Sequence, residues 1–514
     1  MADGETHWQK WHPYVLLAAA VLFSFGRALL APFHFDDHSL SVTPAVASPS
    51  GWLDIFHPTQ TRPLTYLTFW VNYRLGGVDP AGYHAVNLAL HIVSAFLVML
   101  CLRRLMPPRA ALIAAFVFAI HPIQTEAVVY VFARSSLLAA CLTFAALRCW
   151  LDGRLWTAVA WFAAALLAKE EVAAFPVFLA LLHRATARQM RERAPIGVML
   201  ALSLAATVRV AWMAATTPGS GAGAQAGVSP VAYFLTQGYA LLRYLQLLAV
   251  PVGFTVDPDI PILADWRGAV CWVTLAGILY VALRFTGQLR AGFWFFAALI
   301  LIAPTSSVFP AADLAADRRL YLPMLAFAAI AGVLLERTQY TVLLLAGGAV
   351  LAMLSFARTD VWLSEPRLWE EAMQWAPEKA RPRVHLARVS PPAQALAYLL
   401  DAKRIAPDDA LVASDIGQVF LERKQPSEAL VEFGRAVALE PRNPFSLNNR
   451  AVALSLLGMR DLALADLRQS LTLAPCFLDA RRNLRRLGEP TAIPAHCRLT
   501  DEERRGYNEA GSHH

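Results

Sequence analysis

Residues 14–32 read YVLLAAAVLFSFGRALLAP, and residues 33–40 continue with FHFDDHSL. The first stretch is long enough to cross a bilayer, because a spanning helix needs about 20 predominantly apolar residues. Asp36 and Asp37 are therefore expected at the far membrane face, at headgroup depth. A partly desolvated acid beside a second carboxylate suits a general base or a pair of metal ligands. The alternative is that the pair solvates a loop or caps a following helix.

The composition of the whole chain predicts an integral membrane protein. Of its 514 residues, 57% are hydrophobic and 16% are charged, and the mean hydropathy is +0.44. This chain is too apolar for a soluble enzyme of its size. The net charge of +7 lies largely beside hydrophobic segments, where cytoplasmic loops collect Lys and Arg. We interpret this charge as a sign of topology, and no nucleic-acid partner is expected.

The six cysteines show no C-x-x-C spacing of the kind that binds metals. Four of them lie in or at the ends of apolar segments, namely Cys101, Cys141, Cys149 and Cys271. Only Cys476 and Cys497 fall in polar sequence. They could pair if that part of the chain faces an oxidising compartment, and two free thiols are the alternative.

Apolar segments recur along the first 358 residues and predict about eleven crossings, some of them tilted or short. After the first run, which reads as a retained anchor, they fall at 82–102, 110–120, 134–151, 155–168, 171–183, 195–214, 268–285, 292–304, 319–335 and 338–357. Residues 61–74 mix aromatic side chains with Arg62 and Arg74, which predicts a helix lying in the interface. The stretch 231–250 contains Arg243 and is predicted to be re-entrant or interfacial.

Basic clusters predict the orientation of the bundle. With the N-terminus in the cytoplasm, one side receives Arg103-Arg104 with Arg109, Arg148 with Arg154, 184–193, and Arg284 with Arg290. The opposite side receives the functional-looking stretches, namely Asp36-Asp37, 121–134, 169–171, the Gly- and Ala-rich loop 216–227, and 313–319. An odd number of crossings also places the C-terminus on this outer side.

Beyond Arg358 the chain becomes a soluble helical region with a repeat. The prolines Pro377, Pro407, Pro441 and Pro475 follow one another at spacings of 30, 34 and 34 residues. Thirty-four residues is the tetratricopeptide (TPR) period, which predicts an α-solenoid. The groove of such a solenoid usually binds a protein or peptide, with a cap or dimerisation surface as the alternative. The predicted parts are a membrane domain at 1–358, a repeat domain at 359–488 and a tail at 489–514.

Two polar stretches on the predicted outer face are candidates to meet the Asp pair. His121 and Glu126 follow a crossing and could share a helix face that touches a sugar or a metal. A capped helix end is the alternative for His121 and Glu126. Lys169 and Glu170 sit between two apolar segments, where an ion pair is costly and marks either function or a structural salt bridge.

A third polar stretch, Asp317-Arg318-Arg319, opens a late crossing. A guanidinium group there suits a lipid phosphate, which arginine grips with two parallel hydrogen bonds. The alternative is that one of the two arginines pairs with Asp317. This stretch therefore supplies the cation that is predicted to bind a lipid phosphate.

Several short motifs follow one another along the chain. In order they are Phe35-Asp36-Asp37, Arg62-Pro63-Leu64, Gly82 to His91, His121 to Val128, Ala168-Lys169-Glu170, Arg243-Tyr244-Leu245 through to Asp257, Ser306 to Pro310, and Asp317 to Pro323. This order resembles the transmembrane and tetratricopeptide repeat-containing glycosyltransferases. Those enzymes are similar to protein O-mannosyltransferases and belong to the GT-C superfamily. The most specific motifs are the His-Pro-x-x-Thr-Glu-Ala and Tyr-His-x-x-Asn-x-x-x-His segments.

The resemblance implies a GT-C-like helical membrane enzyme that takes a sugar from a polyprenyl phosphate, undecaprenyl or dolichyl, and transfers it to a protein hydroxyl. Carried onto this sequence, it makes Asp36 the base, with Asp37 positioning the acceptor or supporting Asp36. The candidates for the carrier phosphate are Arg318, Lys169, Arg62 and Arg243. The candidates for the sugar and acceptor pocket are His121, Glu126, Glu170 and His84.

The sequence departs from the family pattern in two places. Asp317 stands where the family usually has a glutamate before the late arginine, and the repeat array is shorter than in eukaryotic members. Mannose and a serine or threonine acceptor are therefore not assumed. A divalent cation is optional, because a lipid phosphate is already a good leaving group. The expected location is a bacterial inner membrane, with the active site and repeats in the periplasm and the TPR groove recruiting the acceptor.

Two rival functions belong to other classes of protein. One is a membrane-anchored TPR scaffold without catalysis, which the replacement of Asp36 without loss of function would favour. The other is a sugar-lipid transporter, since intramembrane ions such as Lys169 and Glu170 also mark translocation routes. Sugar-lipid flux without transfer would favour the transporter.

Overall fold

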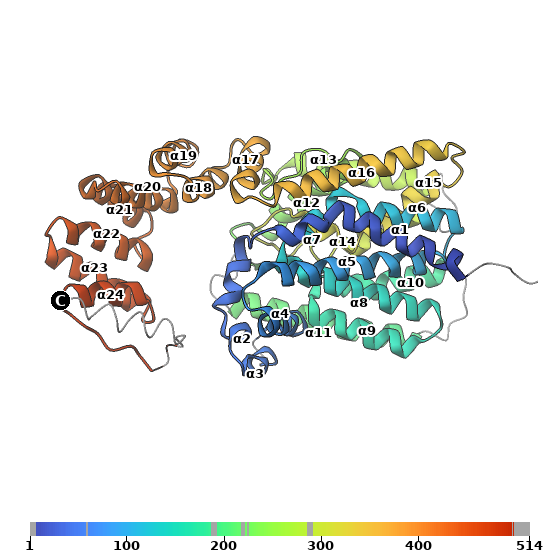
Figure 1. Ribbon diagram of the computed structural model, residues 1–514, viewed down its shortest axis with the longest axis horizontal. Helices are drawn as coiled ribbons and strands as arrows, with labels where there is room; N and C mark the ends of the chain where they lie inside the picture. The colour runs from blue at the N-terminus through green and yellow to red at the C-terminus, as the bar shows by residue number, and fades with distance from the viewer. Residues whose placement is uncertain are drawn as a thin grey trace, which may run out of the picture. The chain divides into compact units, whose positions relative to one another are not determined.

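The computed structural model describes residues 7–57, 60–186, 193–216, 222–223, 226–284, 291–495 and 497. The chain divides into two compact units, with the boundary between Ser364 and Glu365. Both units are built from helices (Figure 1), and across these ranges the only β pairing is an isolated bridge between Ala222 and Ala311. The predicted all-α fold is confirmed.

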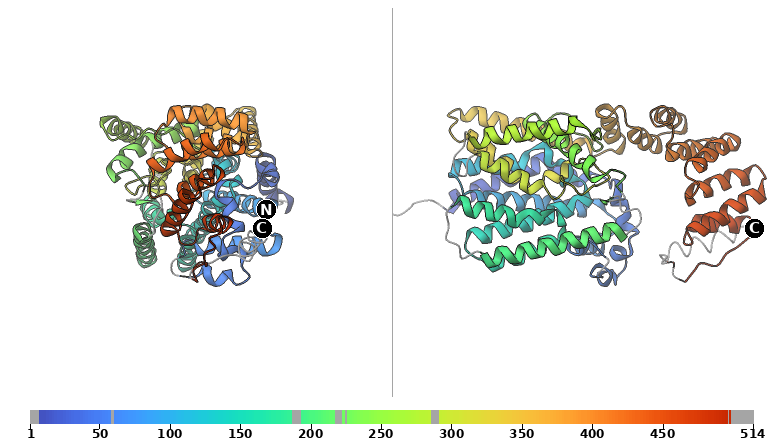
Figure 2. Two further views of the ribbon diagram at one scale, coloured as in Figure 1. Left: turned by 90° about the vertical axis from the view of Figure 1, so that its left-hand side faces the viewer. Right: turned by 180° about the vertical axis from the view of Figure 1, so that it is seen from behind.

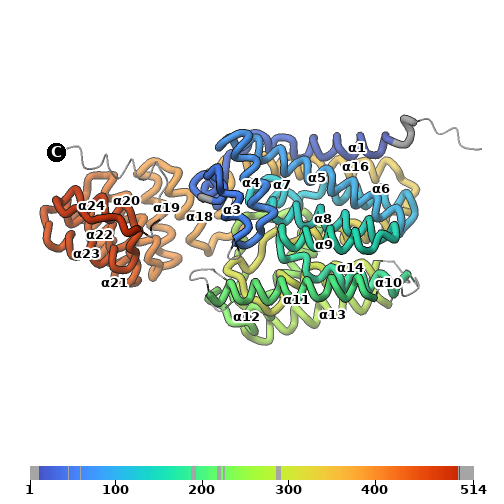
Figure 3. Tube along the Cα trace, turned by 90° about the horizontal axis from the view of Figure 1, so that it is seen from below, coloured from blue at the N-terminus to red at the C-terminus, as the bar shows by residue number. Residues whose placement is uncertain are grey.

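The first unit is a bundle of long helices that lie side by side (Figures 1 and 3). Within the described part of the chain, six segments are long and apolar enough to cross a membrane, and a bent pair would make a seventh. The six are Trp11–Leu30 in α1 (His7–Phe25) and η1 (Gly26–Leu30), Pro80–Leu102 (α5), Val131–Leu151 in η4 (Val131–Ala133) and α8 (Arg134–Leu151), Arg193–Thr216 (α11), Trp266–Arg284 (α13) and Thr341–Val361 (α16). The bent pair joins α6 (Pro108–Ile120) to the helical stretch Pro122–Val129 at 48°.

Three shorter apolar helices add to these segments, namely α9 (Leu155–Ala168), α14 (Ala291–Ile302) and α15 (Met324–Leu335). Apolar helices in this number identify an integral membrane protein. The total of about eleven crossings stays a prediction, because length and composition alone do not decide how the shorter helices lie in the bilayer.

The remaining helices of the bundle are shorter or less apolar. They are α2 (Pro44–Ala47), α3 (Gly51–Ile55), α4 (Pro63–Gly76), α7 (Thr125–Val129), α10 (Phe175–Ala185), α12 (Pro230–Ala249), and the 3-10 turns η2 (Phe35–Ser41), η3 (Pro122–Gln124), η5 (Glu170–Ala174) and η7 (Asp317–Leu320). The helix predicted at 61–74 is present as α4. The stretch 231–250 forms the continuous helix α12, with no turn inside it. The places of α4 and α12 relative to the membrane stay predictions.

Small side chains let the helices of the bundle approach closely, as is typical of membrane proteins. A Cβ atom added to Gly332 in α15 would collide with the carbonyl oxygen of Ala110 in α6. Polar side chains also join helices inside the bundle. His91 in α5 contacts the hydroxyl of Tyr321 at 2.8 Å through Nδ1 and the carbonyl oxygen of Ala119 at 2.9 Å through Nε2. The histidines of the Tyr-His-x-x-Asn-x-x-x-His motif therefore contribute to packing.

The helices α5 and α8 run in the same direction. Near their starts, Arg134 of α8 donates to Asn87 of α5 at 2.9 Å, and just beyond their ends Arg104 pairs with Asp152 at 2.9 Å. The basic cluster around Arg104 thus lies at the end of these helices away from Arg134. Of the other stretches used to predict the orientation, 187–192, 217–221, 224–225 and Arg290 lie outside the described residues. The orientation itself stays a prediction.

The second unit is a stack of antiparallel helix pairs (Figure 2). Its helices are α17 (Glu365–Trp375), α18 (Ala380–Arg388), α19 (Pro392–Ile405), α20 (Ala410–Glu422), α21 (Pro426–Leu439), α22 (Pro444–Leu456), α23 (Arg460–Leu473) and α24 (Leu478–Arg486). Residues 34 positions apart in the repeat have the same role as helix N-caps. Asp409 caps α20 by accepting from Leu411 and Val412, and Asn443 caps α22 by accepting from Phe445 and Ser446. The predicted TPR solenoid is confirmed.

The C-terminal end of the solenoid carries a disulfide between Cys476 and Cys497, with 5.5 Å between their Cα atoms. The structure thereby decides between the two alternatives left open for these cysteines. Of the predicted tail at 489–514, residue 496 and residues 498–514 lie outside the described part of the chain.

Candidate active site

The Asp-Asp loop follows α1 and η1 and packs against η4, which directly precedes α8. Phe35 has φ +50°, in the left-handed region that side chains other than glycine rarely adopt, and this turn leads directly into η2. The Phe35 ring lies edge-on to Tyr130 and to Trp362, with centroids 5.6 and 6.2 Å apart. His34 contacts the carbonyl oxygen of Trp362 at 2.7 Å through Nε2. Aromatic packing therefore holds the strained turn in place.

Asp37 is completely buried, with 0% of its surface exposed. Its carboxylate accepts hydrogen bonds from the backbone nitrogens of His34 at 3.1 Å, Phe132 at 2.8 Å and Val131 at 3.4 Å. Burial raises the pKa of Asp37 to about 7, although these three N–H groups oppose the shift. Of the two roles expected for Asp37, the supporting one fits these contacts, because they fasten the loop to η4.

Asp36 is exposed, in contrast to its neighbour. Its Oδ2 accepts a hydrogen bond from the hydroxyl of Tyr130 at 3.2 Å, and Ser39 donates to its backbone oxygen at 2.6 Å. A carboxylate in this position can accept a proton from a polar group that approaches from outside. Asp36 is therefore accessible, and its role as a base stays a prediction.

Arg318 lies on the other side of Tyr130, with its guanidinium carbon 5.9 Å from the centre of the ring. Its guanidinium group pairs with Glu126, and its backbone nitrogen donates to Glu126 Oε2 at 3.0 Å. A second carboxylate, Asp313, accepts from Arg318 at 3.0 Å. The Arg318 side chain is 26% exposed, Glu126 8% and Asp313 48%. The predicted cation is therefore reachable from one side and anchored from the other.

The alternative partner of the late arginines, Asp317, is buried beside Arg318 in η7. Burial and the neighbouring Glu126 raise the pKa of Asp317 to about 7. Arg319 donates to the carbonyl oxygens of Leu314 and Thr305 at 3.3 and 3.4 Å. Arg318 pairs with Glu126 and Asp313 instead of Asp317, so Glu126 contacts the cation of the site.

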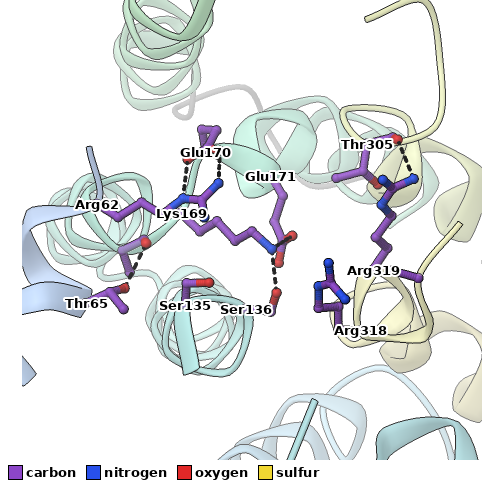
Figure 4. A network of polar contacts seen from close by, with 12 residues as sticks. Arg62, Thr65, Ser135, Ser136, Lys169, Glu170, Glu171, Thr305, Arg318 and Arg319 are labelled. Carbon is purple, nitrogen blue, oxygen red and sulfur yellow. Dashed lines mark hydrogen bonds and ion pairs between the residues drawn. The ribbon is translucent and has the colours of Figure 1, made fainter. Parts of the chain in front are cut away.

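Two ion pairs lie next to each other between α4 and η5 (Figure 4). Arg62 binds Glu170 with two hydrogen bonds, of 2.7 and 3.3 Å. Lys169 binds Glu171 at 2.6 Å and Ser136 at 2.7 Å. Lys169 and Glu170 therefore do not pair with each other, because each of these adjacent residues has a different partner. In Figure 4 the Lys169 side chain extends from the Arg62–Glu170 pair toward Arg318.

The electrostatics of the Arg62–Glu170 pair show how tightly the two groups are coupled. Burial raises the pKa of Glu170, but the charge and hydrogen bonds of Arg62 outweigh it and lower the pKa to about 2. Glu170 is thus ionised at neutral pH and forms an ion pair with Arg62. Its predicted place in the sugar pocket would require this pair to open.

His84, His121 and Arg243 are engaged with backbone atoms. His121 accepts from the nitrogen of Ile123 at 3.1 Å and contacts the carbonyl oxygen of Leu248 at 3.2 Å, so both ring nitrogens are used. His84 is 0% exposed and bonds through Nε2 to the carbonyl oxygen of Ala31 at 3.0 Å. The contacts of His121 fit the alternative of a capped helix end, and the places of His84 and His121 in a sugar pocket stay predictions. Arg243 donates to the carbonyl oxygen of Gly253 at 2.9 Å.

Sequence reasoning missed several residues of this region, of which Tyr130 and Arg134 are the most connected. Arg134 is 0% exposed and donates to Asn87, Asn72, Thr68 and the carbonyl oxygen of Tyr83. Its guanidinium group also lies over the Phe69 ring, 4.6 Å from the centre. The position of Arg134 at the start of an apolar run could have marked it as a candidate. Tyr130 carries no charge and gave no signal.

A metal site was left open in the sequence. In the part of the chain that the structure describes, no group of three or more His, Cys, Asp or Glu side chains could hold a metal ion. The optional divalent cation stays a prediction.

Comparisons with known proteins give the family context of this site. No family model matches the chain. Human protein O-mannosyl-transferase TMTC3 is 25% identical over 446 residues, covering 74% of this chain and 48% of that protein. Drosophila melanogaster protein O-mannosyl-transferase Tmtc1 is 46% identical over 84 residues, covering 16% of this chain and 10% of that protein. The chain thus spans about half or less of the length of these curated relatives.

Among solved structures, ArnT from Cupriavidus metallidurans, bound to undecaprenyl phosphate, is 14% identical with a TM-score of 0.41 and covers 89% of this chain and 80% of that one. The curated relatives are named as protein O-mannosyl-transferases. They confirm the resemblance seen in the motifs, and this chain is similar to the transmembrane and TPR repeat-containing protein O-mannosyl-transferases.

Proposed function

We propose that this protein is a membrane glycosyltransferase that moves a sugar from a polyprenyl-phosphate-linked donor to a hydroxyl group of a protein. The observation that carries the proposal is the line of contacts from Asp36 through Tyr130 to Arg318 and Glu126. It brings an exposed carboxylate and a reachable cation to one region of the bundle. These are the two groups that transfer from a lipid phosphate to a hydroxyl requires.

The reaction proceeds by direct displacement at the anomeric carbon. The acceptor oxygen attacks this carbon while its proton passes to the Asp36 carboxylate. The bond between the anomeric carbon and the phosphate oxygen breaks, and its electron pair leaves with the lipid phosphate. Arg318 stabilises the negative charge that develops on that phosphate. Holding the acceptor and donor in line supplies much of the remaining rate enhancement.

The donor phosphate meets Arg318 from the side of Asp313. Asp313 is the more exposed of the two carboxylates on this arginine, whereas Glu126 is nearly buried. A phosphate can therefore replace Asp313 while Glu126 keeps the guanidinium group in place. Lys169 and Arg62 extend the same region and are the next cations that the carrier would meet (Figure 4).

The repeat unit supports an acceptor-binding role outside the cytoplasm. Disulfides persist in oxidising compartments such as the periplasm, so the Cys476–Cys497 bond supports an outer location for this unit. A TPR solenoid offers a groove that suits a peptide segment of an acceptor protein. We place the N-terminus in the cytoplasm of a bacterial cell and the active site and repeats in the periplasm.

The test compares the parent protein with Asp36→Asn in cells at matched expression and reads the glycan mass on secreted proteins. Asp36 is exposed, so the variant should fold, and we expect transfer to fall by about 100-fold or more because the base is lost. The matched control is Asp37→Asn, which should lower the amount of folded protein because the buried carboxylate joins η2 to η4. Unchanged glycans with folded Asp36→Asn would contradict the proposal and favour the scaffold.

A further inference from the structure

We propose that Tyr130 is a positioning residue that holds the Asp36 carboxylate at a fixed place relative to the Arg318 guanidinium group. This inference rests on the proposed function. It adds a residue for which the sequence motifs gave no role. Tyr130 itself touches neither the sugar nor the phosphate, and it acts through the two groups that do.

The ring of Tyr130 is held on several sides by other aromatic rings. Trp362 stacks on it at 6.3 Å and 28°, and Phe132 at 6.5 Å and 29°. Phe35 packs edge-on at 5.6 Å and 80°. Only 6% of Tyr130 is exposed. These contacts come from three separate parts of the chain, so the ring has one orientation and its hydroxyl one position.

The hydroxyl end of Tyr130 contacts the proposed base. It donates to Asp36 Oδ2 at 3.2 Å. A phenol is protonated at neutral pH and is therefore a steady donor to a carboxylate. The other carboxylate oxygen remains available for the acceptor hydroxyl. The hydrogen bond thus fixes the rotation of the exposed Asp36 side chain, which would otherwise sample several rotamers.

The face of the same ring contacts the proposed phosphate-binding cation. Arg318 lies 5.9 Å from the ring centre, within the range in which the negative face of an aromatic ring attracts a cation. One rigid side chain therefore contacts both charged groups of the site. The distance between base and cation is set by Tyr130, which matters because the attacking and leaving oxygens must lie in line.

The two contacts can be separated by substitution. Tyr130→Phe keeps the ring and its face but removes the hydroxyl. We expect kcat to fall by about 10-fold while KM for the donor stays unchanged, because only the orientation of Asp36 is lost. Tyr130→Leu removes the ring as well. We expect it to lower kcat and also to raise KM for the donor, because Arg318 loses the aromatic face.

The measurement uses the full-length protein in lipid vesicles, with mannosyl undecaprenyl phosphate and mannosyl dolichyl phosphate as donor probes and a serine- and threonine-rich peptide as acceptor. The matched control is Tyr73→Phe, a partly buried tyrosine packed against the nearby cluster around Phe69 and Tyr83, which makes no contact with Asp36 or Arg318 in the described contacts. Thermal unfolding in detergent checks that Tyr130→Phe and Tyr73→Phe are folded like the parent.

The outcomes separate this inference from the proposed function. If the parent transfers sugar, Asp36→Asn abolishes transfer and Tyr130→Phe matches the parent, the positioning role is overturned and the glycosyltransferase stands. Equal losses in Tyr130→Phe and Tyr73→Phe would also overturn it, because they would report a general packing effect. A folded parent that transfers no sugar in the vesicles and adds no glycan mass to secreted proteins in cells would overturn both proposals.

Discussion

Arg134 and Arg318 belong to the same helical bundle but differ in exposure and in the kind of partner that they bind. Arg134 is 0% exposed and binds neutral acceptors, among them Asn87 at 2.9 Å and Asn72 at 2.6 Å. Arg318 is 26% exposed and binds two carboxylates, Glu126 and Asp313. The first arginine is enclosed by the fold. The second is held at an opening.

The comparison shows how partners determine what a cation can do. The acceptors of Arg134 come from α4 and α5, and its guanidinium group lies over the Phe69 ring. Arg134 therefore joins three helices and is closed off from solvent. Arg318 has an exposed carboxylate partner that a phosphate can replace. The sequence alone does not separate these two cases, because both arginines stand next to apolar runs.

The largest effect is expected from Arg134→Met, which tests the structural side of the comparison. The change leaves the buried oxygens of Asn87 and Asn72 without their donor, so we expect a loss of about 3 kcal/mol in the free energy of unfolding. The measurement is the Tm and the yield of folded protein in detergent. Donor KM of the folded fraction should equal that of the parent, and a changed KM with an unchanged Tm would contradict the structural role.

Arg318→Lys tests the functional role of the accessible arginine. It should affect folding less than Arg134→Met does. Lysine keeps the charge but lacks the planar fork that grips phosphate and carboxylate together. We expect kcat/KM for the donor to fall by about 10-fold with little change in Tm. The measurement is initial rates against donor concentration in vesicles. A large fall in Tm with normal kinetics would move Arg318 into the same class as Arg134.

Asp313→Asn should have the smallest effect and the opposite sign. Asp313 is 48% exposed and occupies one edge of the Arg318 guanidinium group, so removing its charge removes a competitor of the phosphate. Because exposed ion pairs contribute little, we expect donor KM to fall by only about 3-fold. The control is Asp152→Asn at the other end of the bundle, where Asp152 pairs with Arg104. A higher donor KM in Asp313→Asn would show that Asp313 supports Arg318 instead of competing for it.

Much of the fold was predictable because the relevant signals are local. The apolar runs gave the helical membrane bundle, and the 34-residue spacing of prolines gave the repeat unit, whose caps Asp409 and Asn443 repeat at the same interval. Asp36 and Asp37 were both expected at the end of a span, within reach of a polar substrate, and the sequence did not show that only Asp36 is exposed. The link of Asp36 to Arg318 was not predictable either, because it depends on Tyr130, an uncharged residue 94 positions away from Asp36.

The partners of several polar residues could not be read from the sequence, for a common physical reason. Lys169 and Glu170 are adjacent in the chain, yet each pairs with a different partner because successive residues of a tight turn point in different directions. His84 and His121 look like ligand-binding residues but saturate backbone groups at helix ends, where unpaired buried donors and acceptors are costly. Residue type alone does not tell a packed polar group from a reachable one.

The sequence by itself determined the class of this protein, the two parts of its chain and the acidic loop, because hydropathy, period and motif order are properties of the linear chain. Only the tertiary structure decided which charges meet. Asp37 is buried and Asp36 exposed, Arg134 is enclosed and Arg318 accessible, and Cys476 is bonded to Cys497. These differences follow from packing between segments that are distant in sequence, and such packing sets the desolvation and the partners on which the chemistry of each group depends.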